Sequence, residues 1–259
     1  MNLVNHLADR AQQHPERIAL IDSNGSITYS KLYQHVCGAS NTLRNDGLGP
    51  GDTALILQPI STPLYISILG AFHAGLTVMF MDPSAGKAMM RNSLKLHQPT
   101  AFIGTAKAHL LRLMIPGIRR IKHHYHSTGW TPGSRKWQPT IANLTEPAAT
   151  TPDSPALITF TSGSTGMPKA ACRTHGFLLA QHEALAESLD YQEAEIDLVT
   201  LPVFTLANLA SGLTSVLADT DLRYPAQADS PSILTQCKNI TSHAAPHHPH
   251  FSRAYTTTA

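Results

Sequence analysis

The chain has 259 residues, of which 42% are apolar and 14% are charged, and its formal net charge is +2 with histidine counted as neutral. This length allows one large domain or two smaller ones, and the low charged fraction argues against disorder driven by charge. The near balance of charge gives no electrostatic reason to expect a nucleic acid or an anionic membrane as a partner. Cys37, Cys172 and Cys237 match no metal or disulfide spacing, so we expect a reduced, cytoplasmic protein.

The first residues lack the basic start and apolar core of a signal peptide. Residues 53–81 contain no Asp, Glu, Lys or Arg and resemble a membrane span in that respect alone, because polar residues and prolines interrupt the run. A buried strand, a helix and a second strand account for this segment. We therefore expect no membrane span, with a spanning segment as the alternative.

The first elements alternate between helix and strand. Apolar residues at helical spacing predict a helix over 30–46, which ends at Gly47. A strand follows at 53–58. Thr62 and Pro63 begin a helix that runs to about residue 73, and a strand at 76–81 comes after it.

Further elements continue the alternation: a helix at 86–97, a strand at 100–105 and a helix at 106–114. Strands alternating with helices at this spacing predict an α/β fold, in which mainly parallel sheets are covered by helices on both faces. The first α/β subdomain is assigned to residues 1–126.

The second half begins with residues 127–155, a stretch rich in Pro, Ser and Thr that we interpret as a long surface connection between subdomains. Residues 156–241 are assigned to the start of a second α/β subdomain, and residues 242–259 to an unrelated, disordered tail. Within the second subdomain the expected elements are a strand at 156–161, a short strand, a helix at 175–189, a strand at 197–203 and a helix at 206–218.

A loop rich in glycine and hydroxyl groups, "TSGSTGMPK", follows the strand at 156–161. Its glycines let the backbone come close to a ligand, its hydroxyls and amides can donate to phosphate oxygens, and its lysine adds a positive charge. The expected phosphate-binding residues are Thr161, Ser162, Gly163, Ser164, Thr165, Gly166 and Lys169. The spacing is not that of the P-loop, because two residues separate Gly166 from Lys169.

Residues 161–169 closely resemble the phosphate-loop signature of the adenylate-forming, or AMP-binding, superfamily of acyl-CoA synthetases, peptide-synthetase adenylation domains and luciferases. Other segments resemble the same family in order: "ILGAFHAGLTVMFMDP", "RTHGFL" and "LPVFTLANLASG". The resemblance covers about residues 3–242. The last segment is most similar to fatty-acyl ligases and to the β-lactone synthetases of olefin biosynthesis, and it makes Phe204, Thr205 and Asn208 candidates for an acyl pocket.

This resemblance implies an AMP-forming acid–thiol ligase that uses ATP with Mg²⁺. A carboxylate, expected to be a fatty acid, would attack the α-phosphate to form an acyl-adenylate, and coenzyme A, another thiol or an internal nucleophile would then accept the acyl group. Preorganised donors around the phosphates would dominate the catalysis.

Several motifs that the family has after the acyl-pocket segment are absent from this sequence: a Tyr-Gly-x-Thr-Glu motif, a Gly-Asp pair of the kind that binds the ribose, a hinge and a late Gly-Lys segment. The chain therefore looks like the incomplete N-terminal half of an adenylate-forming large domain, and we expect low solubility and little or no activity. The alternative is a non-catalytic remnant that binds nucleotide weakly or binds only a protein partner. Catalytic residues cannot be assigned.

Other reactive side chains have structural interpretations. The histidines of "KHHYH" (residues 122–126) and of residues 243–250 are expected at the surface or in the tail rather than as metal ligands. Cys172 is expected to be a buried strand residue. His175 follows the phosphate loop, where it lies near the site or caps the following helix. Asp82 is expected to be a turn residue at a strand end.

Overall fold

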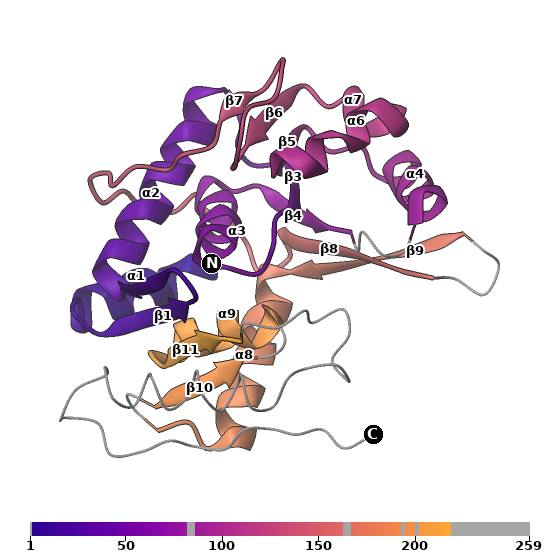
Figure 1. Cartoon of the computed structure of the whole chain (residues 1–259). Coiled ribbons are helices and arrows are strands. Elements are labelled where there is room, and N and C mark those ends of the chain that lie inside the picture. The colour runs from indigo at the N-terminus through magenta and orange to yellow at the C-terminus, as the bar shows by residue number, and fades with distance from the viewer. Residues whose placement is uncertain (1, 82–85, 163–166, 193–194, 200–201, 219–259) are drawn as a thin grey trace. The chain divides into compact units, whose positions relative to one another are not determined.

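The computed structural model describes residues 2–81, 86–162, 167–192, 195–199 and 202–218 (Figure 1). Its chain divides into two compact units. The first comprises Met1–Asn5, Gln34–Pro59 and Pro63–Leu179, and the second comprises His6–Tyr33, Ile60–Thr62 and Ala180–Ala259. These units interleave along the sequence, whereas the predicted subdomains are continuous segments.

The first unit is built on a seven-stranded sheet in the order β7-β6-β5-β3-β4-β8-β9. Neighbouring strands are parallel except for β8 and β9, which form an antiparallel hairpin. The central strand β3 is buried along its whole length, as parallel strands covered on both faces are. The strand bounds are β3 (Thr53–Leu57), β4 (Thr77–Phe80), β5 (Ala101–Gly104), β6 (His123–His126), β7 (Arg135–Lys136), β8 (Pro155–Ser162) and β9 (Pro168–Thr174).

One face of this sheet is covered by four short helices. Leu55, Met79 and Phe102 on the strands form a buried apolar cluster with Leu94 and Ile118 on the helices. Burial of such side chains stabilises the layer by roughly 2 kcal/mol each. The helices are α4 (Gly86–Leu96), α5 (Ala106–His109), α6 (Leu111–Met114) and α7 (Pro116–Arg119).

The other face is covered by α2 (Tyr29–Asn45) and α3 (Thr62–Ala74). Tyr125 on β6 contacts Trp137 edge to face, and the indole N–H of Trp137 donates to Ser67 on α3 at 2.8 Å. Figure 1 shows α2 and α3 on one side of the sheet and α4, α6 and α7 on the other. The predicted α/β fold with helices on both faces is thus confirmed.

The segment 127–155 runs within the first unit and is held against α2 and α3. The carbonyl of Thr145 lies 2.9 Å from Nε2 of His73 on α3, and Arg44 on α2 donates to the carbonyl of Glu146. Gly38 on α2 makes a close approach possible, since a Cβ there would lie 1.9 Å from the carbonyl oxygen of Thr140. The segment is therefore an extended strap across two helices.

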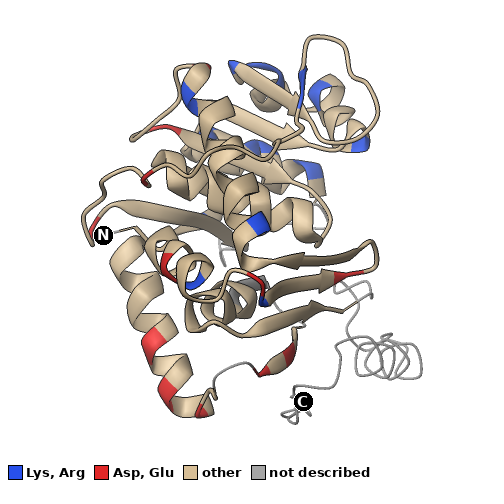
Figure 2. Ribbon diagram, turned by 90° about the vertical axis from the view of Figure 1, so that its left-hand side faces the viewer, with Lys and Arg blue, Asp and Glu red and all other residues tan. Residues whose placement is uncertain are grey.

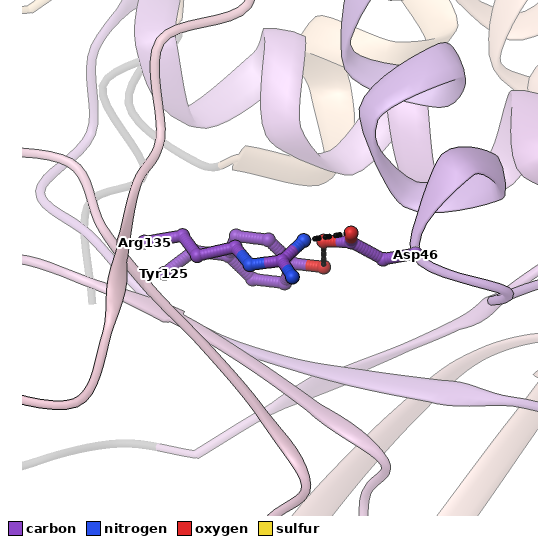
Figure 3. A network of polar contacts seen from close by, with 3 residues as sticks. All are labelled: Asp46, Tyr125 and Arg135. Atoms are coloured by element: carbon purple, nitrogen blue, oxygen red, sulfur yellow. Dashed lines mark hydrogen bonds and ion pairs between the residues drawn. The ribbon is translucent and has the colours of Figure 1, made fainter.

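A polar network joins the end of α2 to the sheet (Figure 3). The hydroxyl of Tyr125 donates to Asp46 at 2.6 Å, and Arg135 on β7 forms an ion pair with the same carboxylate. Asp46 is largely buried whereas Arg135 is exposed. Burial raises the pKa of Tyr125, so the phenol stays protonated and acts as the donor.

The second unit is built on a four-stranded sheet in the order β10-β11-β1-β2. Strand β1 pairs parallel with β11 and antiparallel with β2, so distant segments meet in one sheet. Tyr29 reinforces this union because its buried hydroxyl donates to the carbonyl of Leu213 at 2.7 Å. The remaining bounds are α1 (Val4–Gln13), β1 (Ile18–Asp22), β2 (Gly25–Thr28), α8 (His175–Leu189), β10 (Ile196–Val199), α9 (Pro202–Ser211) and β11 (Thr214–Leu217); α8 begins in the first unit.

Two helix predictions need correction. The segment 206–218 is not one helix, because α9 ends at Ser211 and strand β11 follows. Gly212 adopts φ +84°, a conformation that ends a helix at little cost only for glycine. The segment 106–114 forms two short helices, α5 and α6, instead of one. None of the described helices combines the length and apolar character that crossing a bilayer requires.

Candidate functional site

The β8–β9 hairpin carries the predicted phosphate-binding residues. Thr161 pairs with Lys169, and Ser162 pairs with Pro168, at the end of the hairpin where the loop connects the two strands (Figure 1). The structure therefore places the two ends of the predicted loop opposite each other. Gly163, Ser164, Thr165 and Gly166 lie outside the described residues.

The end of the hairpin extends beyond the rest of its sheet. Strand β4 pairs with β8 only at Leu157 and Ile158, so the segment from Thr159 onward pairs with β9 alone. Thr161 and Lys169 are both exposed, and none of the described carboxylates forms an ion pair with Lys169. A hydroxyl and an ammonium group held on opposite strands can both donate to one anion.

The base of the hairpin carries a second cation that the sequence interpretation missed. The guanidinium of Arg173 on β9 donates to the hydroxyl of Thr159 on β8 at 2.8 Å, and it lies 6.0 Å from the ring centre of Phe177. Cys172 is exposed, so its predicted burial is wrong. It lies on β9, which is an edge strand of the sheet.

His175 begins α8 directly after the hairpin. Its ring is buried, and Nδ1 accepts the backbone N–H of Leu3 at 3.3 Å, which leaves the proton on Nε2. Burial lowers the pKa of His175 to about 4, so the ring is neutral at pH 7. The hydroxyl that caps α8 belongs instead to Thr174, which accepts the N–H of Phe177. His175 thus anchors the end of the hairpin.

The predicted acyl-pocket residues lie on α9 in the second unit. Thr205 and Asn208 are fully buried, whereas Phe204 is half-buried. The amide of Asn208 donates to Asp197 on β10 at 2.8 Å and to Ser215 on β11 at 3.1 Å. Burial raises the pKa of Asp197. Asn208 therefore joins α9 to its own sheet.

The histidines near β6 differ from their prediction. His124 and His126 are buried rather than at the surface, because β6 lies inside the sheet. The rings of His124 and His109 lie 5.9 Å apart, and three of their four nitrogens have no hydrogen-bond partner among the described residues. Within the same residues no three His, Cys, Asp or Glu side chains gather as a metal site. Residues 82 and 243–250 lie outside the described part.

A known protein family matches most of this chain. The family described as AMP-binding enzyme matches residues 7–250, a range that reaches into the predicted tail at 242–259. An olefin β-lactone synthetase of Stenotrophomonas maltophilia is 30% identical over an alignment of 251 residues, which covers 88% of this chain and 44% of that protein. An acetyl-coenzyme A synthetase of Psychromonas ingrahamii is 25% identical over 93% of this chain and 42% of its own length. The chain thus spans less than half the length of these curated relatives.

Solved structures show the same fold. The apo structure of Mycobacterium smegmatis MbtA matches 94% of this chain with a TM-score of 0.76, at 22% sequence identity and over 46% of its own chain. At this identity the likeness establishes the architecture alone.

Proposed function

Since the chain belongs to the family of AMP-binding enzymes, we propose that its β8–β9 hairpin holds the phosphates of ATP for an adenylate-forming ligase. The observation that carries this proposal is the pairing of Thr161 with Lys169 at an exposed hairpin end. Ser162, Gly163, Ser164, Thr165 and Gly166 complete the proposed phosphate-binding loop. The hydroxyl groups would donate hydrogen bonds, and Lys169 would balance the negative charge of the β- and γ-phosphates.

The proposed reaction activates a carboxylic acid. A carboxylate oxygen attacks the α-phosphorus of ATP, a new oxygen–phosphorus bond forms, and the bond to pyrophosphate breaks. Negative charge would grow on the leaving pyrophosphate, and Lys169 would stabilise it. Mg²⁺ would accompany the nucleotide as its counterion. A thiol such as coenzyme A then displaces AMP from the adenylate.

The substrate is proposed as a fatty acid. This rests on the likeness to an olefin β-lactone synthetase and to acyl-CoA-forming relatives, so a β-lactone product is the alternative outcome for the activated acid. Phe204, Thr205 and Asn208 are proposed for the acyl pocket. Only Phe204 keeps partial exposure, and it is the one of the three that can contact an acyl chain without disturbing buried bonds.

A second proposal concerns this polypeptide alone. It spans 44% of the olefin β-lactone synthetase that it matches, and its sequence contains none of the downstream motifs that the family uses for Mg²⁺, ribose and the catalytic lysine. We therefore propose that this polypeptide binds nucleotide but forms little or no adenylate, and that it is poorly soluble.

The test measures binding and chemistry separately. ATP binding is measured by calorimetry, and adenylate formation by carboxylate-dependent exchange of labelled pyrophosphate into ATP. Lys169→Ala should weaken ATP binding roughly 10- to 100-fold, because a charged hydrogen bond is worth about 1.5–3 kcal/mol. Lys95→Ala, at an exposed position on α4, is the control and should leave binding unchanged.

The outcomes separate the proposals. Weakened binding in Lys169→Ala but not in Lys95→Ala supports the phosphate site, whether or not exchange is detected. Carboxylate-dependent exchange by the unaltered polypeptide would overturn the proposed inactivity. Equal ATP affinity in all three proteins would overturn the phosphate site itself.

A further inference from the structure

Charge is divided very unevenly between the two units. The first unit contains thirteen Lys and Arg against five Asp and Glu, a formal charge of +8, and the second contains six against twelve, a formal charge of −6. The net charge of +2 is the small difference of these two values. Figure 2 shows the cations in blue and the anions in red. The first unit therefore has a strongly positive surface.

Most of this positive charge lies in one stretch. Residues 83–145 contain ten Lys and Arg and no Asp or Glu. Eight of the ten belong to α4–α7 and the turns beside them, the layer that covers one face of the seven-stranded sheet. Lys107, Arg119, Arg120 and Lys122 are exposed. By contrast, Arg135 is paired with Asp46.

The same layer exposes large apolar side chains. Leu113 on α6 is 84% exposed, Trp130 in the following loop is 77% exposed, and Leu110 is 59% exposed. Two hydrogen bonds hold the loop beside α5 and α6: Arg112 donates to the carbonyl of Pro132 at 2.9 Å, and the N–H of residue 106 donates to the carbonyl of residue 128 at 3.2 Å. The loop that carries Trp130 therefore lies beside the helices α5 and α6, next to Lys107, Leu110 and Leu113 in the sequence.

We propose that this surface, defined by Leu110, Leu113, Trp130 and the cations of α5–α7, binds the face of an anionic lipid membrane. Tryptophan and leucine enter the boundary between head groups and acyl chains, and surrounding Lys and Arg attract anionic lipids. The binding is peripheral, since no described helix can cross a bilayer. It does not depend on the proposed function.

Lipid fits this surface better than an acidic macromolecule does. A purely acidic partner would pair with the cations and leave Leu113 and Trp130 in water, where their exposure has no benefit. A membrane offers negative charge and an apolar layer within the same few ångströms, so it uses both kinds of side chain. The two kinds are intermixed along α5–α7, as the positions 107, 110, 113 and 119 show.

The experiment is a vesicle flotation assay with the whole chain. Vesicles of phosphatidylcholine mixed with phosphatidylglycerol are compared with vesicles of phosphatidylcholine alone. Two double variants, Leu113→Ser with Trp130→Ser and Lys107→Glu with Arg119→Glu, test the apolar and the charged contributions. The matched controls are Leu144→Ser and Lys31→Glu, which change an exposed leucine and an exposed lysine outside this layer.

The proposal expects binding to the anionic vesicles only, with a loss of roughly tenfold or more in each double variant and no loss in the controls. Trp130 emission should shift to shorter wavelength on binding. Raising the salt concentration from about 0.1 M to about 1 M shortens the Debye length from about 10 Å to about 3 Å, so it should weaken binding to the anionic vesicles.

Three results would overturn the proposal. One is the absence of binding to anionic vesicles by folded protein. Another is equal binding to neutral vesicles. The third is binding that the charge variant abolishes but the Leu113 and Trp130 variant leaves unchanged, which would assign the surface to an acidic protein or a nucleic acid instead.

Discussion

The two units handle buried polar groups in different ways. The first unit buries neutral histidines, His73, His124 and His175, and places its cations outside. In the second unit, which has more acidic than basic residues, the amide of Asn208 donates hydrogen bonds to Asp197 and Ser215. Candidate binding residues follow the same division, since Lys169 in the first unit is exposed whereas Asn208 in the second is buried. Lys169 is therefore accessible to a ligand, whereas Asn208 also holds α9 to its own sheet.

Acid should produce the largest difference between the units. Burial lowers the pKa of His73, His124 and His175 to about 4. The unfolded chain, with an ordinary histidine pKa of about 6.5, binds more protons between these values. The stability that these groups contribute is therefore complete above about pH 6.5 and is lost as the pH falls toward 4.

This loss should amount to at least about 3 kcal/mol for the first unit. Both tryptophans lie in the first unit, so their fluorescence follows it alone while hydrogen exchange follows the second. His124→Phe removes one titrating ring and should move the acid midpoint to lower pH. Unfolding of the second unit before the first as the pH falls would contradict the prediction that the buried histidines make the first unit more sensitive to acid.

Breaking the buried network of the second unit should have the next largest effect. Asn208→Leu removes the donor of Asp197 and should lower the free energy of unfolding by about 1.5–3 kcal/mol, because a hydrogen bond to a half-buried carboxylate is lost. Chemical denaturation followed by circular dichroism measures this change. Ser211→Ala, near the end of the same helix, should cost much less. An unchanged stability in Asn208→Leu would mean that these hydrogen bonds do not stabilise the fold.

A smaller effect is expected in the first unit's network of Tyr125, Asp46 and Arg135, of which only Arg135 is exposed. Tyr125→Phe removes a hydrogen bond to Asp46 and should cost about 1.5 kcal/mol. Arg135→Ala removes only an exposed partner of the same carboxylate and should cost less than about 1 kcal/mol. Chemical denaturation of both single variants and of the double variant gives the interaction energy between Tyr125 and Arg135. If Arg135→Ala lowered the free energy of unfolding more than Tyr125→Phe does, Arg135 and not Tyr125 would be the main partner of Asp46.

The smallest effect concerns the two described cysteines. Cys172 is exposed and Cys37 is buried, so alkylation of the folded protein should modify Cys172 first, as peptide mass spectrometry would show. Cys172→Ser should change the free energy of unfolding by less than about 0.5 kcal/mol. Preferential labelling of Cys37 under native conditions would mean that the first unit opens readily.

Much of the fold could be predicted from apolar spacing. The helix at 175–189 agrees with α8 residue for residue, and the strands and helices over 53–81 agree within one residue at each end. The helix at 206–218 was wrong in its second half because apolar spacing does not distinguish a helix from a short buried strand, and only the positive φ of Gly212 separates them. The burial of Cys172 was wrong because periodicity cannot identify an edge strand.

The family resemblance, the α/β class and the residues of the phosphate loop depend on local order along the chain, so each could be predicted from the sequence. Which side chains are accessible depends on how distant segments pack together. The folded structure pairs Thr161 with Lys169, buries His124 and Asn208, and divides a net charge of +2 into a basic unit and an acidic unit. The physical reason is that burial and charge distribution depend on contacts between distant segments, such as β1 with β11, which no local pattern contains.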